Sequence, residues 1–467
     1  MKAKKSVPTE TVTFDYCIGG KLSRSYAEGR GGKWEAIPEA AYYLNDKPLS
    51  ESLFSALTPR QADWLEIAHA VYLADRLVLR GTSLKSHAGA IWTRRLKIRI
   101  AVRERDFWYS LKSDLERFLF FLTQDIWDFE FTAGYQARST QDQNFLFSTV
   151  PSDALVMLAS GGLDSLAGAI IHKEMHPTKH IVLVSAFTNP RIQKTQSEQA
   201  TFLAGTNRSK LTHVAVGMNL RGWDRPKELE PTQRSRGFFH LSLGCIAAMA
   251  IGSRELLVNE NGIGALNLPF DRSQIGAQSS RPVNPVTLVE MSQLASKIHE
   301  ERFSITNPFI LKSKGEMCAQ AISGQLMFSH SMSCDRPQRS NDGWHCGICT
   351  SCLLRRMSLN SAGISPEDDT TRYLKNLLDP QPQKSLQMLE KMEWQASQLA
   401  ALLEEAEPWN ALSQEYPMLA RVASTMQQYS SVSSPETELM KLLKRHVSEW
   451  RQFPLRHRLD MQLLEAA

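Results

Sequence analysis

An apolar run at residues 155–158 leads without a spacer into a serine- and glycine-rich turn, 159–165, and then into a helical stretch. A run of apolar residues with no polar alternation is typical of a strand buried on both faces, as strands of parallel sheets are. Comparable runs stand at 181–184 and 255–258, and helical stretches separate them. Strands that alternate with helices in this way predict an α/β fold with a doubly wound parallel sheet over residues 151–378.

The residues before this region, 1–150, predict an α+β N-terminal accessory domain. Apolar and basic side chains alternate from 95 to 102, which is the period of a half-buried strand. Apolar residues recur at helical spacing on both sides of it, at 64–72 and at 111–122. The basic face of the strand could meet an acidic partner, but it is more simply a solvated charged surface.

The residues from 379 to 467 predict a helical C-terminal extension. One apolar stripe runs along 389–403 at helical spacing. A second helix is expected to begin near Ser434 and Pro435, because they form a good cap and first-turn pair. Both stripes are most simply packing faces.

Composition limits the classes of function. The chain has 467 residues, 42% of them hydrophobic and 22% charged, and a formal net charge of +5. This is enough apolar material for a sizeable core. The mild positive charge suits an anionic ligand, but the clustered basic residues of a dedicated nucleic-acid-binding protein are missing. No apolar run is long enough to span a membrane and no signal peptide is recognisable, so we expect a cytoplasmic protein without a membrane partner.

The turn at 159–165 has the chemistry of a phosphate-binding loop. Gly161 and Gly162 let the backbone turn sharply and approach a ligand closely. Their N–H groups can form a concave anion site at the positive end of the next helix. Asp164 is unexpected beside phosphates unless it holds Mg²⁺ or orients a donor. The hydroxyl donors of the loop are Ser160 and Ser165.

A second polar loop, 259–262, also follows an expected strand. Ligands of doubly wound sheets bind at the carboxyl ends of the strands. Asn259, Glu260 and Asn261 therefore stand where a polar loop can read a ligand.

The cysteines predict a metal site. Three of the seven are isolated, and the other four crowd together at Cys334, Cys346, Cys349 and Cys352. Four thiols with two-residue spacers around Gly347 suit a tetrahedral Zn²⁺ that leaves no open position for water, which is a structural rather than a catalytic metal. An iron–sulfur cluster also accepts four thiolates and remains the alternative. His345 is then a neighbour of the metal site or a surface residue.

The loop resembles the PP-loop of ATP pyrophosphatases, enzymes that cleave ATP to AMP and pyrophosphate. The sequence Ser160-Gly161-Gly162-Leu163-Asp164-Ser165 has the form SGGxDS, between an expected strand and an expected helix. The resemblance implies that all six residues bind ATP, with Mg²⁺ as a further cofactor.

A PP-loop followed by a C…CGxCxxC knuckle and Arg355 resembles 7-cyano-7-deazaguanine synthase, QueC. Residues 237–243 are similar to that family's GRN-x-x-x-LS helix start, and residues 306–316 to its TPL-x-x-L-x-K-x-E segment. Residues 358–373 resemble the short tail after its knuckle. The similarity covers about residues 155–375.

The resemblance implies a reaction and roles for residues. In that family, ATP activates 7-carboxy-7-deazaguanine as an acyl adenylate, ammonia attacks to give an amide, and further ATP forms the nitrile. Asp164 and Ser165 are then catalytic, and Lys312 steadies charge near the adenylate, although a solvated loop lysine is an equally simple interpretation. Arg234 and Arg236 become candidate anion binders.

The chain also departs from that family. Its YGQRH signature is replaced by residues 186–191, its DYSGYPDCR stretch is hard to find in 261–280, and the two flanking regions have no counterpart. This layout resembles the enlarged relatives found in bacterial antiviral defence systems of the Qat and type IV CBASS kind. A protein encoded nearby is then the expected amine partner. The alternatives are an ordinary nitrile-forming synthase and a catalytically silent nucleotide-binding scaffold in a defence complex.

Overall fold

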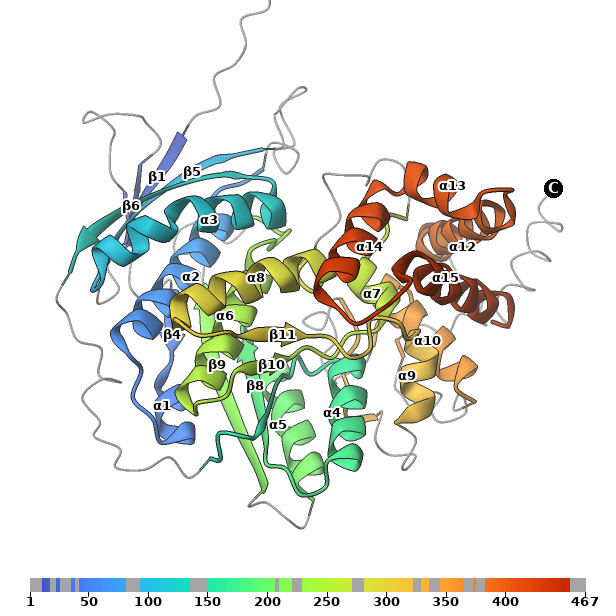
Figure 1. Cartoon of the computed structure of the whole chain (residues 1–467), viewed down its shortest axis with the longest axis horizontal. Coiled ribbons are helices and arrows are strands. Elements are labelled where there is room, and N and C mark those ends of the chain that lie inside the picture. Colours follow the sequence, from blue (N-terminus) through green and yellow to red (C-terminus); the bar gives the residue numbers. More distant parts are fainter. Residues whose placement is uncertain are drawn as a thin grey trace, which may run out of the picture.

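The structure is a computed structural model that describes residues 11–16, 22–25, 35–37, 42–80, 93–134, 150–205, 210–220, 229–270, 281–321, 329–335, 345–363, 373–374 and 383–453. Two sheets and their helices form successive layers, and a group of C-terminal helices stands beside them (Figure 1). In the described part of the chain no helix is long and apolar enough to cross a membrane.

The larger sheet is the expected parallel sheet. Its strand order is β11-β10-β7-β8-β9-β4. All of its pairs are parallel except the last, in which β4 runs antiparallel to β9. The strands are β4 (Tyr42–Asn45), β7 (Leu155–Leu158), β8 (Ile181–Phe187), β9 (Leu211–Leu220), β10 (Glu255–Leu257) and β11 (Ser304–Thr306).

Helices cover both faces of this sheet, which confirms the doubly wound prediction. Successive strand residues alternate between two cores: Val182 and Val184 of β8 join one, and Leu183 joins the other. The helices of the first face are α6 (Arg236–Ala250) and α8 (Pro285–His299). Those of the second are α4 (Leu163–Met175), α5 (Pro190–Ala204) and α9 (Lys314–Gln320).

The smaller sheet has the order β3-β2-β1-β5-β6. Its members are β1 (Thr11–Tyr16), β2 (Leu22–Ser25), β3 (Glu35–Ile37), β5 (Arg95–Val102) and β6 (Ile126–Ala133). The helices of this region are α1 (Lys47–Leu53), α2 (Pro59–Leu77) and α3 (Arg105–Thr123). In β5 every second residue is buried, as the sequence predicts. Its basic side chains pair within the sheet: Lys97 lies 3.0 Å and Arg99 3.4 Å from Glu130. The charged face is thus largely neutralised by its own neighbours.

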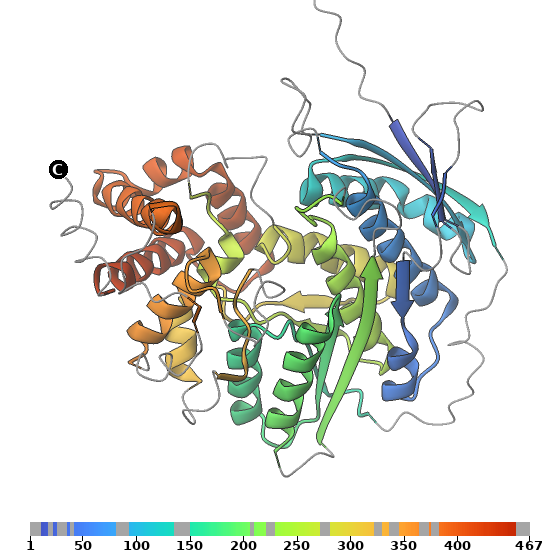
Figure 2. The same ribbon diagram turned by 180° about the vertical axis from the view of Figure 1, so that it is seen from behind.

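The N-terminal region is joined tightly to the larger sheet. Phe118 of α3 and Phe238 of α6 have ring centroids 5.7 Å apart, and one apolar core runs through both regions. Strand β4 precedes residue 150 yet completes the larger sheet, where it lies beside β9 (Figure 2). The domain boundaries at about residues 150 and 378 stay predictions, and this strand crosses the first of them.

A buried group of charges also ties the N-terminal region to the start of α6. Arg94 lies 2.5 Å from Asp75 and 2.6 Å from Asp125, and Arg80 lies 2.6 Å from Asp125. Asp75 accepts hydrogen bonds from the backbone N–H and the hydroxyl of Ser235, both at 2.8 Å. Burial alone would raise the pKa of Asp75, but Arg94 and these donors hold it below its usual value.

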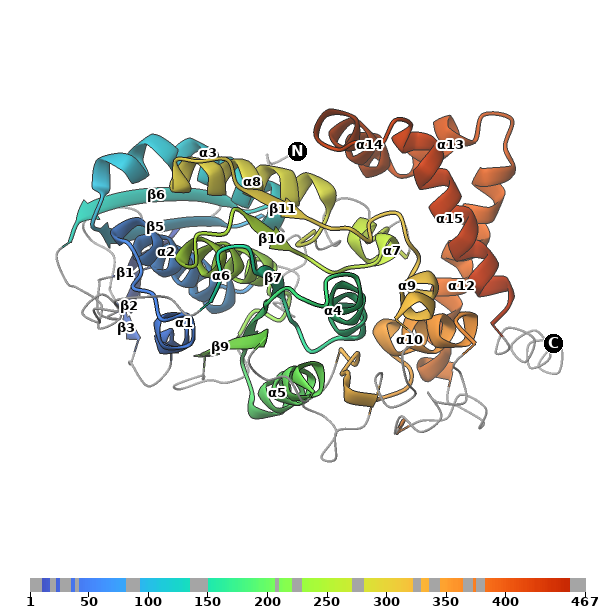
Figure 3. The same cartoon turned by 60° about the horizontal axis from the view of Figure 1, so that its bottom comes forward.

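The C-terminal region is helical, as expected. It consists of α12 (Gln383–Glu404), α13 (Pro408–Glu415), α14 (Pro417–Tyr429) and α15 (Pro435–Arg451). The apolar faces of α12 and α15 pack on each other, on α10 (Thr350–Ser361) and on the short α7 (Gly262–Leu266). Figure 3 shows α9 and α10 between these helices and α4. Side chains of α12 and α15 nevertheless line the same cavity as Ser160 and Gly162 of the loop that follows β7.

Candidate functional site

The glycine-rich loop lies where the winding of the larger sheet changes direction. From β7 the chain adds β8 and β9 on one side, and later β10 and β11 on the other. The loop after β7 and the polar loop after β10 therefore meet at a topological switch point, which is the ordinary ligand position in such sheets.

The hydroxyl groups of the loop form hydrogen bonds within the loop itself. The hydroxyl of Ser160 accepts from the N–H of Gly162 at 3.1 Å and lies 3.1 Å from the hydroxyl of Ser165. Gly161 has φ +86°, in the left-handed region that favours glycine. Gly162 is the N-cap of α4, and no side chain caps that helix. The first N–H groups of α4 are thus available to an anion.

Neighbouring segments donate hydrogen bonds to the backbone carbonyl groups of the loop. Gln199 of α5 donates to the carbonyl oxygen of Gly161 at 3.0 Å, and the backbone N–H of Met332 donates to the same oxygen at 2.8 Å. Gln196 donates to the carbonyl oxygen of Ser160 at 3.3 Å. A Cβ at Gly161 would lie 3.3 Å from the side chain of Gln196. This support fixes the loop before any ligand binds.

Asp164 is the centre of a charged cluster that joins three segments. Its carboxylate lies 2.7 Å from the ammonium of Lys314, at the start of α9. The amide nitrogen of Asn261 donates to Asp164 at 3.2 Å and to Glu260 at 3.0 Å. Burial, and then the nearby charge of Asp164, raise the pKa of Glu260 to about 8. Two carboxyl groups and one lysine therefore share a small buried volume.

The lysine of this cluster is not the one expected from the sequence. Lys312 donates to the side chain of Gln320, at the other end of α9, and it does not line the cavity described below. Lys314, two residues further along the chain, lies beside Asp164 instead. The signal was present in the chain, because Lys314-Gly315-Glu316 has the K-x-E spacing of the segment that residues 306–316 resemble.

A cavity of about 410 Å³ extends from the loop toward the C-terminal helices. Its polar end carries Ser160, Asp164, Glu260, Asn261 and Lys314, so Glu260 and Asn261 of the second polar loop do face the site. Arg236 also lines it, whereas Arg234 lies buried beside the charges of Arg80 and Asp125. The substrate segment sought in 261–280 lies partly outside the described residues.

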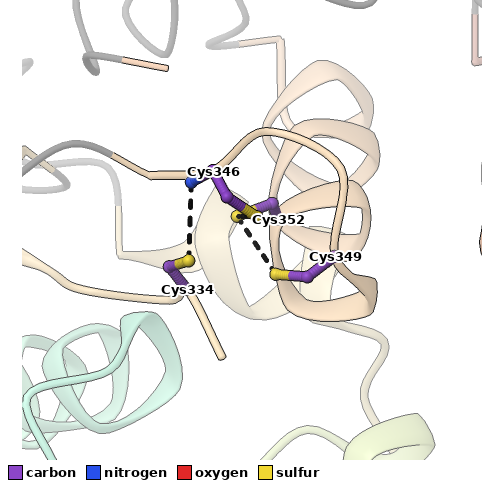
Figure 4. A group of neighbouring side chains, drawn as sticks. All are labelled: Cys334, Cys346, Cys349 and Cys352. Atoms are coloured by element: carbon purple, nitrogen blue, oxygen red, sulfur yellow. Dashed lines mark hydrogen bonds between the residues drawn. The ribbon is translucent and has the colours of Figure 1, made fainter. Parts of the chain in front are cut away.

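The four cysteines form one compact group (Figure 4). Their sulfur atoms all lie within 4.8 Å of one another, with Cys349 3.3 Å and Cys346 3.9 Å from Cys352. Sulfur atoms around a tetrahedral Zn²⁺ stand about 3.8 Å apart, given Zn–S bonds of about 2.3 Å. Gly347 has φ +84°, the left-handed turn that the knuckle needs. The donor set therefore fits zinc.

The knuckle also shapes the wall of the cavity. Arg355, fully buried in α10, donates to the hydroxyl groups of Ser331 at 2.6 Å and Ser333 at 3.3 Å. His345 is buried beside the knuckle, and its imidazole accepts from the N–H of Ser333 at 3.0 Å. These bonds hold the strip that contains Met332 against the loop. The metal site thus has a structural connection to the ligand site.

The comparisons with known proteins point to one family. The family model "Queuosine biosynthesis protein QueC" matches residues 280–363. The 7-cyano-7-deazaguanine synthase of Cupriavidus taiwanensis is 30% identical over 141 residues, which are 30% of this chain and 56% of that protein. The synthases of Rhizorhabdus wittichii and Novosphingobium aromaticivorans are each 27% identical over 47% of this chain and over 94% and 93% of their own lengths.

The chain thus spans little more than half the length of the Cupriavidus relative and nearly all of the other two. The family model ends before the C-terminal helices begin. Together with the parallel sheet and the helices on both of its faces, these similarities support a QueC-like protein, and the α/β core is consistent with a PP-loop domain.

Proposed function

We propose that this chain uses ATP to activate a carboxylated deazaguanine as an acyl adenylate and passes the acyl group to an amine. The observation that carries the proposal is the joint position of the glycine loop, Asp164, Lys314 and Glu260 at the end of one cavity. The names of the relatives, 7-cyano-7-deazaguanine synthases, supply the substrate class.

The loop would bind the phosphates of ATP. The uncapped N–H groups of α4 are donors at the loop, and the hydroxyl groups of Ser160 and Ser165, which are bonded within the loop, would turn toward a phosphate. Lys314 adds a positive charge that Asp164 holds in place at 2.7 Å. A carboxylate oxygen of the substrate attacks the α-phosphorus, the bond to the bridging oxygen of the β-phosphate breaks, and pyrophosphate leaves.

Asp164 and Glu260 would hold Mg²⁺. Burial, and then the charge of Asp164, raise the pKa of Glu260, so a cation beside the two carboxyl groups would favour its ionised form. Oxygen ligands from carboxylates are those that Mg²⁺ prefers, and the ion would supply charge neutralisation for the phosphates. The four cysteines would hold zinc in a purely structural role, because all four positions of a tetrahedral ion are filled by sulfur.

We propose further that the amine belongs to a partner protein and that the reaction serves antiviral defence. The amine nitrogen attacks the acyl carbon, AMP leaves, and the nitrogen loses a proton. About half of the chain lies outside the region that the longest matches cover, and a small acceptor such as ammonia would require no such additional surface.

Product analysis tests the proposal. Purified protein with ATP, Mg²⁺ and 7-carboxy-7-deazaguanine is expected to release AMP and pyrophosphate, and a variant with Asp164→Ala to release neither. Release of ADP and phosphate alone would contradict it. Efficient formation of free nitrile from ammonia, with neighbouring proteins unmodified in mass spectrometry, would favour an ordinary synthase. A protein that binds ATP without turnover would favour a silent scaffold.

A further inference from the structure

The cavity has a second end that carries no charged side chain. It is formed by the segment after α7, by α10 and by two helices of the C-terminal region, and those last two helices are outside the residues matched by the family model. Its apolar lining consists of Leu266, Leu268, Phe270, Leu354, Leu399 and Leu443. Asn267, Thr350 and Ser351 also line the cavity from these segments, and Gln395 of α12 and His446 of α15 add two polar side chains from the C-terminal helices.

His446 is a buried polar group without a hydrogen-bond partner in the described part of the chain. Only 2% of the residue is exposed, and among the described residues none forms a hydrogen bond with its ring. Burial lowers the pKa of His446 to about 4, so the imidazole is neutral at pH 7 and offers one donor and one acceptor. An imidazole buried without partners is unfavourable, whereas one that lines a cavity can bind a ligand.

Gln395 is held in a single orientation. Its amide nitrogen donates to the carbonyl oxygens of Leu268 at 3.0 Å and Pro269 at 2.9 Å. Because both bonds need the nitrogen, the amide cannot be reversed, and its oxygen remains as the atom that can accept from a ligand. Gln395 is only 3% exposed, so this acceptor is as enclosed as the ring of His446.

We propose that this end of the cavity binds a flat, purine-like ring, with His446 and Gln395 bonding to its polar edge and Leu399 and Leu443 contacting its faces. The inference rests on the proposed function, because it gives the heterocycle of that reaction its place. A purine-like ring has apolar faces and an edge of donors and acceptors, which matches an apolar lining with a few fixed polar groups. Two sources share this chemistry: the adenine of ATP and the deazaguanine substrate.

His446→Phe tests the role, because phenylalanine keeps the size of the ring and removes its hydrogen bonds. We expect the KM for one of the two substrates to rise about tenfold or more, with kcat changed by less than about threefold. A raised KM for ATP assigns the ring to adenine, and a raised KM for 7-carboxy-7-deazaguanine assigns it to the second substrate. His446→Gln, which can still donate and accept, is expected to recover part of the loss.

Both KM values within about twofold of wild type, in a variant with an unchanged melting temperature, would overturn the inference. Should His446→Phe unfold the protein, Gln395→Met tests the acceptor oxygen by the same two KM values. If the wild-type protein shows no turnover, the proposed function fails separately, and calorimetry with adenosine and with 7-carboxy-7-deazaguanine replaces kinetics. About tenfold weaker binding to His446→Phe would support the assignment, and equal binding, or no binding to wild type, would overturn it.

Discussion

The two ends of the cavity are built in different ways. The polar end is made mainly from residues that directly follow β7 and β10, with Lys314 added from the start of α9. The uncharged end is made from the segment after α7, from α10 and from α12 and α15, and these last two helices follow in the sequence after the whole parallel sheet. Charges are concentrated at the first end and absent from the side chains that line the second. The difference suggests that chemistry and ligand recognition are divided between the sheet and the C-terminal helices, and the following experiments test that division.

The largest effect is expected at the knuckle, which supports one wall of the cavity. Cys349→Ser is expected to release the metal and to lower the free energy of unfolding by about 4 kcal/mol or more, because a structural zinc site contributes folding energy directly. Metal analysis and thermal melting measure both. Cys245→Ser, a buried cysteine far from the group in sequence, is the control and should retain the metal. A Cys349→Ser variant that binds no metal but is as stable as wild type would contradict a structural role for the metal site.

The polar end should control the rate. Lys314→Met is expected to lower kcat about 10²- to 10³-fold, because it removes the positive charge beside Asp164 in the loop. Lys312→Met, two residues away with its ammonium bonded to Gln320, should stay within about threefold of wild type. Steady-state kinetics of the pair distinguishes the two lysines. The opposite pattern would restore Lys312 to the role first expected for it.

The uncharged end should control binding rather than rate. Leu443→Ala is expected to raise a substrate KM about three- to tenfold with little change in kcat, since it removes contact area from one cavity wall. Leu439→Ala removes an equally buried side chain of α15 that does not line the cavity. Both variants should lose about 2–5 kcal/mol of stability, so only KM separates them. Equal KM values in the two variants would contradict a binding role for this wall.

The smallest effect concerns the pH dependence of stability. Burial and the charge of Asp164 raise the pKa of Glu260 from its ordinary value of 4.5 to about 8, so stability falls as the pH rises through this window. Glu260→Gln removes that loss. Without Mg²⁺, its melting temperature relative to wild type should be higher at pH 8 than at pH 5, by an amount equivalent to about 1 kcal/mol or more. An equal difference at both pH values would show that Glu260 ionises normally.

The same contrast explains what the sequence could predict. The strands around 155–158, 181–184 and 255–258, the loop and the four cysteines are local patterns, and the structure has each of them where it was expected. The cavity wall made by α12 and α15 depends on how segments far apart in the sequence pack together. The apolar stripes of these helices predict that one face is buried, but they do not predict which part of the protein covers that face.

Two features of the structure were not predicted, for physical reasons of the same kind. The crossing of β4 into the larger sheet is a pairing between residues far apart in the chain, which no local pattern encodes. Lys312 and Lys314 differ only in which side of a short turn they occupy, and the helix cap at Ser313 decides this. The side chain of Ser313 accepts a hydrogen bond from the N–H of Glu316, so α9 begins directly after Ser313. Lys314 is then the first residue of the helix, and it lies beside Asp164.

Isotope exchange between pyrophosphate and ATP tests the central claim most directly, because it reports reversible formation of an acyl adenylate without regard to the amine. With wild-type protein, Mg²⁺ and 7-carboxy-7-deazaguanine, labelled pyrophosphate is expected to enter ATP. The exchange should depend on the acid, persist in Lys312→Met and fall about 10²-fold or more in Lys314→Met. No exchange in wild-type protein that turns over ATP, or exchange that is the same without the acid, would contradict the account.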